Sequence, residues 1–220
     1  MIKCCIFDLD GTVLDTIATI THFVNVTLQK HGFSEITEDE CKVFVGNGAR
    51  VLIKRTLASK NVFDDSAVET ILADYDRAYN SDPLYLTDAF SGIREVLAKL
   101  RADGIKLALL SNKQHSITKS VSERFFPGLF DVVYGGRDGF PLKPDATVAK
   151  SILEELGVSA DETAWVGDTS TDIETSKNLG AALAIGVLWG FRKKEELVSS
   201  GADVIVSEPC DIYRAVKEYA

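Results

Sequence analysis

Near the N-terminus, residues 2–12 of the chain read IKCCIFDLDGT. This segment is a short apolar run, from Ile2 to Phe7, that ends in a polar turn containing glycine. Such a pattern predicts a buried β-strand that runs into a turn. Side chains at positions i and i+2 of an extended chain point the same way, so Asp8 and Asp10 can face one bound group.

The pattern that follows this strand is helical. Between residues 16 and 80, apolar side chains recur at helical spacing, beginning with Ile17, Ile20 and Val24, and no strand pattern interrupts them. The motif Thr37-x-x-Glu40 has the spacing of a capping box, which opens a helix. We therefore expect a block of helices over residues 16–80.

The sequence pattern changes again after Gly92, where stretches with helical spacing alternate with apolar strands. The expected strands cover residues 106–110, 131–134, 163–166, 182–185 and, more weakly, 203–206. This alternation indicates a parallel sheet that is covered by helices on both faces. We therefore predict an α/β protein with a Rossmann-like parallel sheet core, formed by residues 1–15 and 81–220. A helical domain, residues 16–80, is inserted after the first strand.

The composition excludes several classes of protein. With 45% apolar and 26% charged residues, the 220-residue chain is typical of a protein with its own core and not of a disordered one. Its 24 basic and 33 acidic side chains give a net charge of −9, and the longest basic run is Arg192-Lys193-Lys194. We therefore expect no nucleic acid and no membrane as a partner. Nothing in the sequence predicts an oligomeric state.

The four cysteines and the apolar segments bear on the compartment. Cys4, Cys5, Cys41 and Cys210 form no CxxC motif and no zinc-binding spacing with histidine, and two of them lie in the first expected strand. We interpret those two as small core residues. No apolar run approaches the roughly 18 residues of a membrane span, and no secretory leader is apparent. We therefore expect a cytoplasmic protein.

Polar residues follow several of the expected strands, at the ends where ligands bind in parallel sheets. They are Asp8 and Asp10 after the first strand, Ser111 and Asn112 after the second, Lys143 in the loop before the fourth, and Asp168 after the fourth. Carboxylates that are brought together repel one another unless a divalent cation neutralises them, and Mg²⁺ takes oxygen ligands. A hydroxyl, main-chain N–H groups and a lysine can hold a phosphate group.

Each of these signals has an ordinary structural interpretation when it is taken alone. A Ser-Asn pair after a strand is more often a helix cap, and Lys143, which precedes Pro144, would by default be an exposed loop lysine. The order and placement of all the signals together are far more specific. They predict a convergent polar site at one edge of the sheet.

The same motifs resemble those of the haloacid dehalogenase superfamily of phosphohydrolases. Residues 8–15, DLDGTVLD, resemble its first motif almost letter for letter, and Leu110-Ser111-Asn112 resembles the second. Lys143-Pro144-Asp145 is similar to the third motif, and residues 167–172, GDTSTD, to the fourth. The helical block between the first and second motifs resembles the cap of the phosphoglycolate-phosphatase-like branch.

The resemblance implies a role for each carboxylate. Asp8 would be the nucleophile that forms an aspartyl-phosphate, and Asp10 would be the general acid and base. Mg²⁺ would be held by Asp8, by the main-chain carbonyl of Asp10 and by Asp168. Asp172 would either bind the metal directly or hold Lys143 or a metal ligand in place without binding the metal itself.

The resemblance also implies how phosphate would be held. Ser111 and Lys143 would bind the transferred phosphoryl group, with Asn112 beside them. In the helical block, the residues Gly46-Asn47-Gly48-Ala49-Arg50 resemble a glycine-containing cap segment of the same branch. A plain turn between two helices is the more ordinary interpretation. Our hypothesis is that this loop faces the active site and contributes to substrate choice, with Arg50 as an anion contact.

These features predict a phosphatase that acts on a small phosphorylated metabolite such as phosphoglycolate. Alternatives within the branch are an inorganic pyrophosphatase and a nucleotide or sugar phosphatase, and a phosphomutase is less favoured. A non-catalytic phosphate-binding protein or a receiver-like module is the alternative outside enzymes. At Phe90-Ser91-Gly92 and at Ala146 the sequence lacks prolines that are frequent in the branch. These departures weaken the assignment of phosphoglycolate as the substrate in particular. The segment Trp189-Gly190-Phe191-Arg192 resembles one shared by phosphoglycolate phosphatases and a pyrophosphatase.

Overall fold

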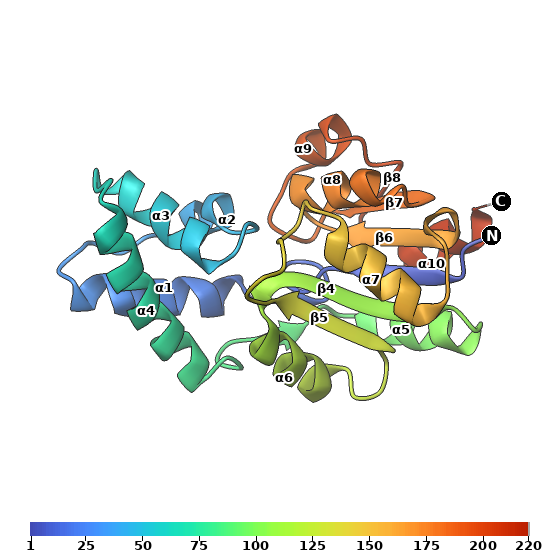
Figure 1. Cartoon of the computed structure of the whole chain (residues 1–220), viewed down its shortest axis with the longest axis horizontal. Helices are drawn as coiled ribbons and strands as arrows, with labels where there is room; N and C mark the ends of the chain where they lie inside the picture. The colour runs from blue at the N-terminus through green and yellow to red at the C-terminus, as the bar shows by residue number, and fades with distance from the viewer. Residues whose placement is uncertain (220) are drawn as a thin grey trace. The chain divides into compact units, whose positions relative to one another are not determined.

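The protein has the predicted α/β architecture in its computed structural model, which describes residues 1–219 (Figure 1). The chain forms two compact units. The first contains Met1–Asp15 and the chain from Ala89 onward, and the second is Thr16–Asp88. A parallel sheet forms the centre of the first unit, and the second is helical. That the helical unit acts as a cap stays a prediction.

The sheet has six parallel strands in the order β5-β4-β1-β6-β7-β8. In chain order they are β1 (Cys4–Phe7), β4 (Lys106–Gln114), β5 (Val132–Gly136), β6 (Thr163–Gly167), β7 (Leu183–Val187) and β8 (Val204–Val206). From β1 the sheet grows to one side through β4 and β5, and to the other through β6, β7 and β8. The strand order therefore reverses beside β1, and the carboxyl ends of strands at such a point are where parallel sheets bind ligands.

The helices of the first unit lie against this sheet. They are α5 (Ile93–Ala102), α6 (His115–Phe125), α7 (Thr147–Leu156), α8 (Ser170–Leu179), α9 (Lys194–Ser199) and α10 (Pro209–Glu218), with a 3-10 turn, η1 (Ala160–Glu162), before β6. The α7 helix packs on β4 and β5, and α8 packs on β6 and β7. Two positive-φ glycines, Gly157 and Gly180, end α7 and α8 as left-handed caps, a conformation that glycine adopts without strain.

The β1 strand is buried on both of its faces. Cys4 and Ile6 pack in one cluster with Ile152 of α7 and Trp165 of β6, and all four side chains are fully buried. Phe7 instead meets Phe130 edge to face, with the ring centroids 6.2 Å apart. A strand with two buried faces reads as a continuous apolar run, which explains why the opening segment shows no alternation.

The second unit contains four helices. They are α1 (Ile17–Lys30), α2 (Glu38–Phe44), α3 (Ala49–Ser59) and α4 (Asp65–Ser81). The α4 helix packs against both α1 and α3. The predicted capping box is present: Glu40 N–H donates to Thr37 Oγ1 at 3.2 Å, and Thr37 N–H donates to Glu40 Oε2 at 2.7 Å. Two short strands, β2 (Leu14–Asp15) and β3 (Asp88–Ala89), pair where the chain crosses between the units.

The second strand of the sheet unit is longer than the sequence predicts. We expected it to end at Leu110 and a helix to begin after Asn112, but β4 continues to Gln114 with a shift of register against β5. The helix cap is Gln114, so the interpretation of Ser111-Asn112 as a cap is wrong. The amide of Asn112 bonds to the main chain of Lys143 instead, and Gln114 pairs with Gly136 of β5.

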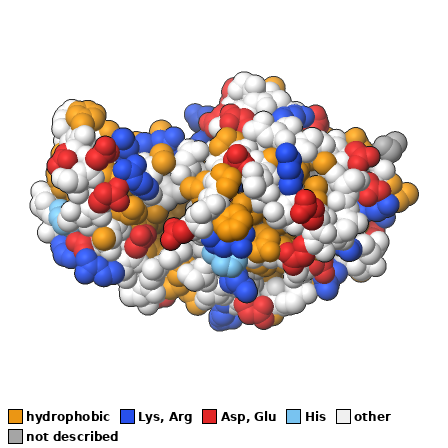
Figure 2. Space-filling model, in the orientation of Figure 1, with side chains coloured by type: hydrophobic (Ala, Val, Ile, Leu, Met, Phe, Trp, Pro, Cys, Tyr) orange, Lys and Arg blue, Asp and Glu red, His pale blue; other side chains and the backbone are white. Residues whose placement is uncertain are grey.

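The surface carries charges of both signs. Figure 2 shows acidic and basic side chains interspersed over the visible face of the molecule. Within residues 1–219, no helix combines the length and the apolar character that a membrane span requires.

Candidate active site

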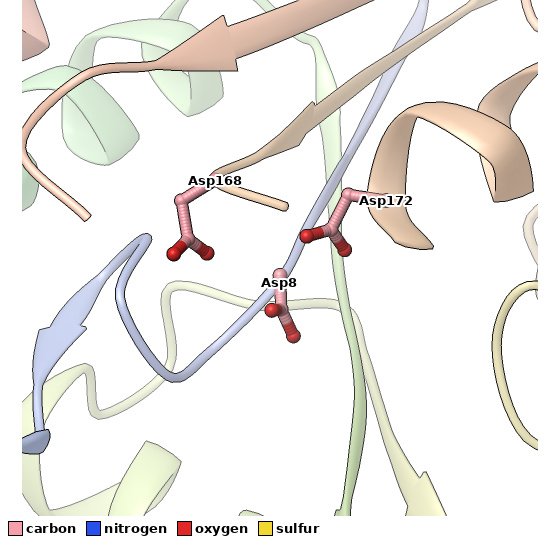
Figure 3. Close-up of side chains that lie close together, drawn as sticks. All are labelled: Asp8, Asp168 and Asp172. Carbon is pink, nitrogen blue, oxygen red and sulfur yellow. The ribbon is translucent and has the colours of Figure 1, made fainter. Parts of the chain in front are cut away.

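Three carboxylates meet at the carboxyl ends of β1 and β6. Asp8 directly follows β1, Asp168 directly follows β6, and Asp172 lies in the first turn of α8 (Figure 3). One oxygen from each lies within 4.8 Å of the others. Asp168 and Asp172 are fully buried and Asp8 is 7% exposed. The Asp8 N–H donates to the carbonyl of Val166 at 3.0 Å, so β1 is fixed to β6 at the point where these side chains emerge.

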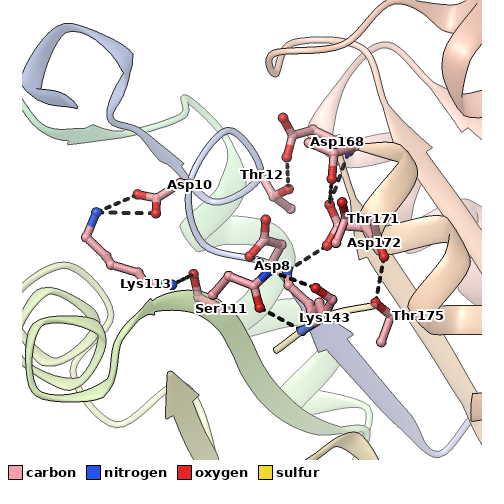
Figure 4. Close-up of polar contacts among 12 residues, drawn as sticks. Asp8, Asp10, Thr12, Ser111, Lys113, Lys143, Asp168, Thr171, Asp172 and Thr175 are labelled. Atoms are coloured by element: carbon pink, nitrogen blue, oxygen red, sulfur yellow. Dashed lines mark hydrogen bonds and ion pairs between the residues drawn. The ribbon is translucent and has the colours of Figure 1, made fainter. Parts of the chain in front are cut away.

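Lys143 lies between two of these carboxylates. Its Nζ is 2.7 Å from Asp8 Oδ1 and 2.7 Å from Asp172 Oδ1, and its side chain is only 3% exposed (Figure 4). The interpretation of this residue as an exposed loop lysine is therefore excluded. The amide of Asn112 fixes its main chain, because Nδ2 donates to the Lys143 carbonyl at 3.0 Å and Oδ1 accepts from the Lys143 N–H at 2.8 Å.

Asp172 is occupied on both of its oxygens. Oδ1 accepts from Lys143, and Oδ2 accepts from the Thr169 N–H at 3.1 Å and from the Thr169 hydroxyl at 2.7 Å. It thereby caps α8 at the helix end where a negative charge is favourable. The contact with Lys143 agrees with the supporting role, and both interpretations of this residue stay predictions.

Asp168 is held in a different way, by neutral donors. Oδ1 accepts from the Thr12 hydroxyl at 2.9 Å, and Oδ2 accepts from the Phe191 N–H at 2.8 Å. Trp189 Nε1 donates to the Thr12 carbonyl at 3.0 Å. At Gly190 a Cβ atom would lie 2.3 Å from Asp168 Cβ, so only glycine allows this approach. The loop after β7 thus fixes a carboxylate after β6.

The electrostatics of the cluster are unbalanced. Burial, reinforced by the charge of Asp172, raises the pKa of Asp8 well above its usual range although Lys143 opposes the shift. Burial and Asp172 also raise the pKa of Asp168 to about 7. For Lys143, burial lowers the pKa but Asp172 and Asp8 outweigh it, so the ammonium form is stabilised. When all three carboxylates are ionised, Lys143 alone leaves the cluster with an excess of negative charge, and the raised pKa values reflect the cost of that state.

The residues fit a bound divalent cation. Asp8 Oδ1 is buried and, apart from its ion pair with Lys143, accepts no hydrogen bond of regular geometry from the described residues. Beside Lys143, carboxylate oxygens of Asp8, Asp168 and Asp172 lie within 4.8 Å of one another, and carboxylate oxygens are ligands that hard cations such as Mg²⁺ prefer. A cation here would relieve the repulsion that raises the pKa values of Asp8 and Asp168.

Asp10 lies apart from the three-carboxylate cluster. Its oxygens Oδ1 and Oδ2 are 3.0 Å and 3.3 Å from Nζ of Lys113 (Figure 4). Ser111, which is buried, accepts at Oγ from the Lys113 N–H at 3.2 Å. The structure thus places Ser111 and Lys113 on the same strand end as Asn112, next to the turn that carries Asp10.

The predicted specificity loop belongs to the helical unit. Residues 46–48 connect α2 to α3, and Arg50 lies in the first turn of α3. Arg50 Nε is 2.7 Å from Glu69 Oε1 on α4, and the side chain is 51% exposed. Its charge is therefore partly compensated within its own unit, and its role as an anion contact stays a prediction.

Sequence analysis missed four residues that shape the site: Thr12, Lys113, Gly190 and Phe191. Signals for them exist. Thr12 lies inside the first motif, and Lys113 directly follows Ser111-Asn112. The segment around Gly190 stood out as a resemblance, but its contact with Asp168 crosses 23 positions of chain and has no local pattern.

The arrangement suits group transfer to a carboxylate. Asp8 offers an oxygen at the end of a rigid strand, with a lysine beside it that can stabilise negative charge on a transferred group. A second carboxylate, Asp10, lies two residues further on. Such a set can combine a nucleophile with a separate acid and base.

Comparisons with known proteins agree with this chemistry. Residues 5–185 match the model of the haloacid dehalogenase-like hydrolase family. The phosphoglycolate phosphatase of Aquifex aeolicus (strain VF5) is 32% identical over 97% of this chain and 96% of its own. That of Rhodospirillum rubrum is 33% identical, with 92% and 86% covered.

A solved structure shows the same likeness. The crystal structure of a proposed phosphoglycolate phosphatase from Lactobacillus delbrueckii subsp. bulgaricus has a TM-score of 0.94 and 31% identity, with 97% of this chain and 98% of that chain covered. The resemblance inferred from the four motifs is confirmed. This protein is an enzyme of phosphatase type, and the chain belongs to the haloacid dehalogenase-like hydrolase family.

Proposed function

We propose that the protein is a Mg²⁺-dependent phosphatase of a small cytoplasmic phosphate monoester, with phosphoglycolate as the first candidate, and that it acts through an aspartyl-phosphate on Asp8. The observation that carries this proposal is the position of Asp8 at the reversal of strand order, paired with Lys143 and next to Asp168. The names of the relatives support the substrate.

The metal site of this proposal uses three residues. Asp8, the main-chain carbonyl of Asp10 and Asp168 would hold Mg²⁺. When bound, Mg²⁺ would neutralise charge on the phosphoryl oxygens and so favour attack by an anion. Thr12 and the Phe191 N–H keep Asp168 in one orientation, so little reorganisation of this ligand is needed.

The first step transfers the phosphoryl group to the protein. A carboxylate oxygen of Asp8 forms a bond to phosphorus while the bond from phosphorus to the ester oxygen breaks. Asp10 gives its proton to the departing oxygen, so the leaving group departs as an alcohol. The products of this step are the acyl phosphate on Asp8 and the ionised form of Asp10.

The second step regenerates the enzyme. Asp10 takes a proton from water as the water oxygen bonds to phosphorus. The bond from phosphorus to the Asp8 oxygen breaks, which releases inorganic phosphate and the free Asp8 carboxylate. Asp10 is then protonated again, as the first step requires.

Four further residues act through position and charge. Lys143 would bind the phosphoryl oxygens, and Asp172 holds its ammonium group in place. Asn112 holds the main chain of Lys143, so we assign it a positioning role at the phosphate site. Ser111 would donate its hydroxyl to a phosphoryl oxygen. In the helical unit, we propose that Arg50 and the loop Gly46-Asn47-Gly48 contribute to substrate choice.

Phosphate release from a panel of compounds tests the function. The panel contains phosphoglycolate, a sugar phosphate, a nucleotide, pyrophosphate and an aryl phosphate, each with Mg²⁺ and with a chelator. We expect Mg²⁺-dependent release, greatest from phosphoglycolate, and loss of at least about 10³-fold in kcat with Asp8→Asn because the nucleophile is removed. Asp39→Asn is the matched control, since Asp39 is an exposed residue of α2.

Each outcome of this panel has a defined meaning. A preference for pyrophosphate, a nucleotide or a sugar phosphate would replace the substrate and keep the mechanism. Release that survives chelation would contradict the metal requirement. Full activity of Asp8→Asn would contradict the covalent intermediate, and no release from any compound by folded, Mg²⁺-loaded protein would contradict the phosphatase proposal.

A further inference from the structure

The pair formed by Lys113 and Asp10 is a feature that the proposed mechanism does not use. Lys113 Nζ lies 3.0 Å from Oδ1 and 3.3 Å from Oδ2 of Asp10. The side chains are 10% and 18% exposed, so both charges are largely removed from water. Figure 4 shows the Asp10 carboxylate turned toward Lys113 and away from Asp8 and Asp168.

The two lysines of the site serve different carboxylates. Lys143 bridges Asp8 and Asp172, on the side of the site where the phosphoryl group would be transferred. Lys113 compensates Asp10. Because Asp10 would act on the ester oxygen, its partner Lys113 lies on the side of the site that receives the leaving group. This placement rests on the function proposed above.

The pair conflicts geometrically with the role of Asp10. A single ammonium group lies within 3.3 Å of both carboxylate oxygens, so both face the lysine and not a substrate. For Asp10 to reach the ester oxygen at hydrogen-bond distance, at least one of these contacts has to break. The ligand-free arrangement therefore has to change when a substrate binds.

The change has an energetic condition. Separating the two charges of a largely buried ion pair is unfavourable unless each charge finds another partner. At 10% exposure, the Lys113 side chain gains little solvation when Asp10 turns away from it. A substrate with a neutral leaving group offers it no replacement, whereas a leaving group that carries its own negative charge does.

We propose that Lys113 is a positioning and specificity residue that exchanges Asp10 for a second anionic group on the leaving-group side of the substrate. The exchange frees Asp10 to face the ester oxygen and at the same time binds the substrate. The protein thereby favours phosphate monoesters whose alcohol carries a carboxylate or another anion, because such a substrate can replace Asp10 on Lys113 and release it.

A matched pair of esters tests this proposal on the wild-type protein. The esters are 2-phosphoglycolate and its primary amide, which differ in the charge of the leaving group and little in shape. We expect kcat/KM to favour the carboxylate ester by about 10²-fold, since truncating one partner of a buried charge pair typically has an effect of this size. Equal kcat/KM values for the two esters would overturn the proposal without any variant.

Two variants locate the effect at Lys113. Lys113→Met keeps most of the length of the side chain and removes its charge, so the carboxylate ester should lose about 10²-fold more kcat/KM than the amide ester. Lys113→Arg keeps the charge and should retain most of the preference. An equal loss of kcat/KM on both esters would show that Lys113 has only a structural role. A preference for the carboxylate ester that persists in Lys113→Met would show that another residue recognises the negative charge.

A binding measurement separates this inference from the phosphatase proposal. The probes are 3-phosphonopropionate, in which a methylene group replaces the ester oxygen, and its amide, with affinities measured by calorimetry in the presence of Mg²⁺. The wild type should bind the carboxylate more tightly, and Lys113→Met should not. This result would uphold the charge selection even if no ester were hydrolysed, and equal affinities in the wild type would refute it even if phosphate were released.

Discussion

Two clusters of charged side chains in this protein have opposite compositions. In the sheet unit, three buried carboxylates share the single lysine Lys143. In the helical unit, one carboxylate, Asp74 of α4, is surrounded by three basic side chains. They are Lys30, 2.7 Å away, His31, 2.8 Å away, and Arg77 in direct contact.

The pKa values of the two clusters shift in opposite directions. Burial raises the pKa values of Asp8 and Asp168, because the charged form loses its water and meets other negative charges. Hydrogen bonds from Lys30 and His31 lower the pKa of Asp74 to about 2. A raised carboxylate pKa means that ionisation at neutral pH is unfavourable for the fold, and a lowered one means that it is favourable.

The difference distinguishes a cluster that a ligand would complete from one that only connects two helices. The contacts of Asp74 are complete within the helical unit, where they connect the end of α1 to α4. The cluster at Asp8 has more negative charge than its own residues compensate, and a ligand that supplied positive charge would stabilise it. Proteins retain such imbalance where a ligand completes the site.

Replacing Lys143 should have the largest effect and so give the clearest difference between the two clusters. We expect Lys143→Met to lower kcat by about 10²–10³-fold, because a group that stabilises the transferred phosphoryl charge is lost. Its unfolding free energy should fall by about 3–5 kcal/mol, since the buried carboxylates lose their cation. Steady-state kinetics and urea unfolding measure the two effects.

Lys177→Met is the matched control for this variant. Lys177 forms an ion pair of similar length, 2.8 Å, with Asp203, but its side chain is 42% exposed. We expect a change of about 1 kcal/mol or less, because water and salt weaken exposed pairs. Equal losses of stability in the two variants would show that burial does not distinguish the pairs.

The second prediction concerns pH and the metal-free protein. Burial and Asp172 raise the pKa of Asp168 from its usual 3.8 to about 7, so between these pH values the folded state binds more protons than the unfolded state. Stability is therefore lost as pH rises through this window. Asp168→Asn removes the titrating group, so its unfolding free energy should fall less steeply, and above about pH 7 it should be the more stable metal-free protein.

Urea unfolding in the presence of a chelator, repeated across that pH window, measures this effect. The difference between wild type and Asp168→Asn cancels contributions from titrating groups that Asp168 does not influence, such as His115, whose pKa is lowered by burial and by nearby positive charge. Added Mg²⁺ should stabilise the wild type and not the variant. Parallel stability curves for the two metal-free proteins would contradict the raised pKa.

The sequence predicts the parts of this site that lie at strand ends. Three local patterns in the sequence predict them: the apolar run before Asp8, the alternation of strands and helices, and the motif around Asp168. The structure contains the corresponding strands and helices. Carboxyl ends of parallel strands meet at one edge, so the convergence of these residues follows from topology alone.

The rest of the site depends on contacts between distant segments. Lys113 and Asp10 are 103 positions apart, and no local pattern predicts their ion pair. Past Leu110 the strand β4 continues to Gln114, which pairs with Gly136 of β5, and the Asn112 amide bonds to the Lys143 main chain, 31 positions away. Burial of Lys143 is likewise a tertiary effect, since the sequence around it reads as an ordinary loop.

The contacts of Asp74 in the helical unit are likewise not predictable from local sequence patterns. Apart from the controls, replacing this residue should have the smallest effect of the substitutions considered. Arg77 lies one turn after Asp74 on α4, but Lys30 and His31 come from the end of α1, and the sequence does not indicate that this end meets α4. Asp74→Asn should lower the unfolding temperature at neutral pH by less than Lys143→Met does, because the side chains of Lys30 and Arg77 are 59% and 75% exposed and water competes for them. Values of kcat and KM should not change.

The pH dependence of this variant should be opposite to that of Asp168→Asn. The pKa of Asp74 is lowered from 3.8 to about 2, so its ionised form contributes stability that is present above pH 3.8 and lost as pH falls through about 2. The difference in unfolding temperature between wild type and Asp74→Asn should therefore shrink toward zero in acid, whereas Asp39→Asn, a carboxylate that is 93% exposed, should show little difference at any pH. A change in kcat, or a stability difference that persists at the lowest pH, would mean that Asp74 does more than join two helices, and the contrast between the two clusters would fail.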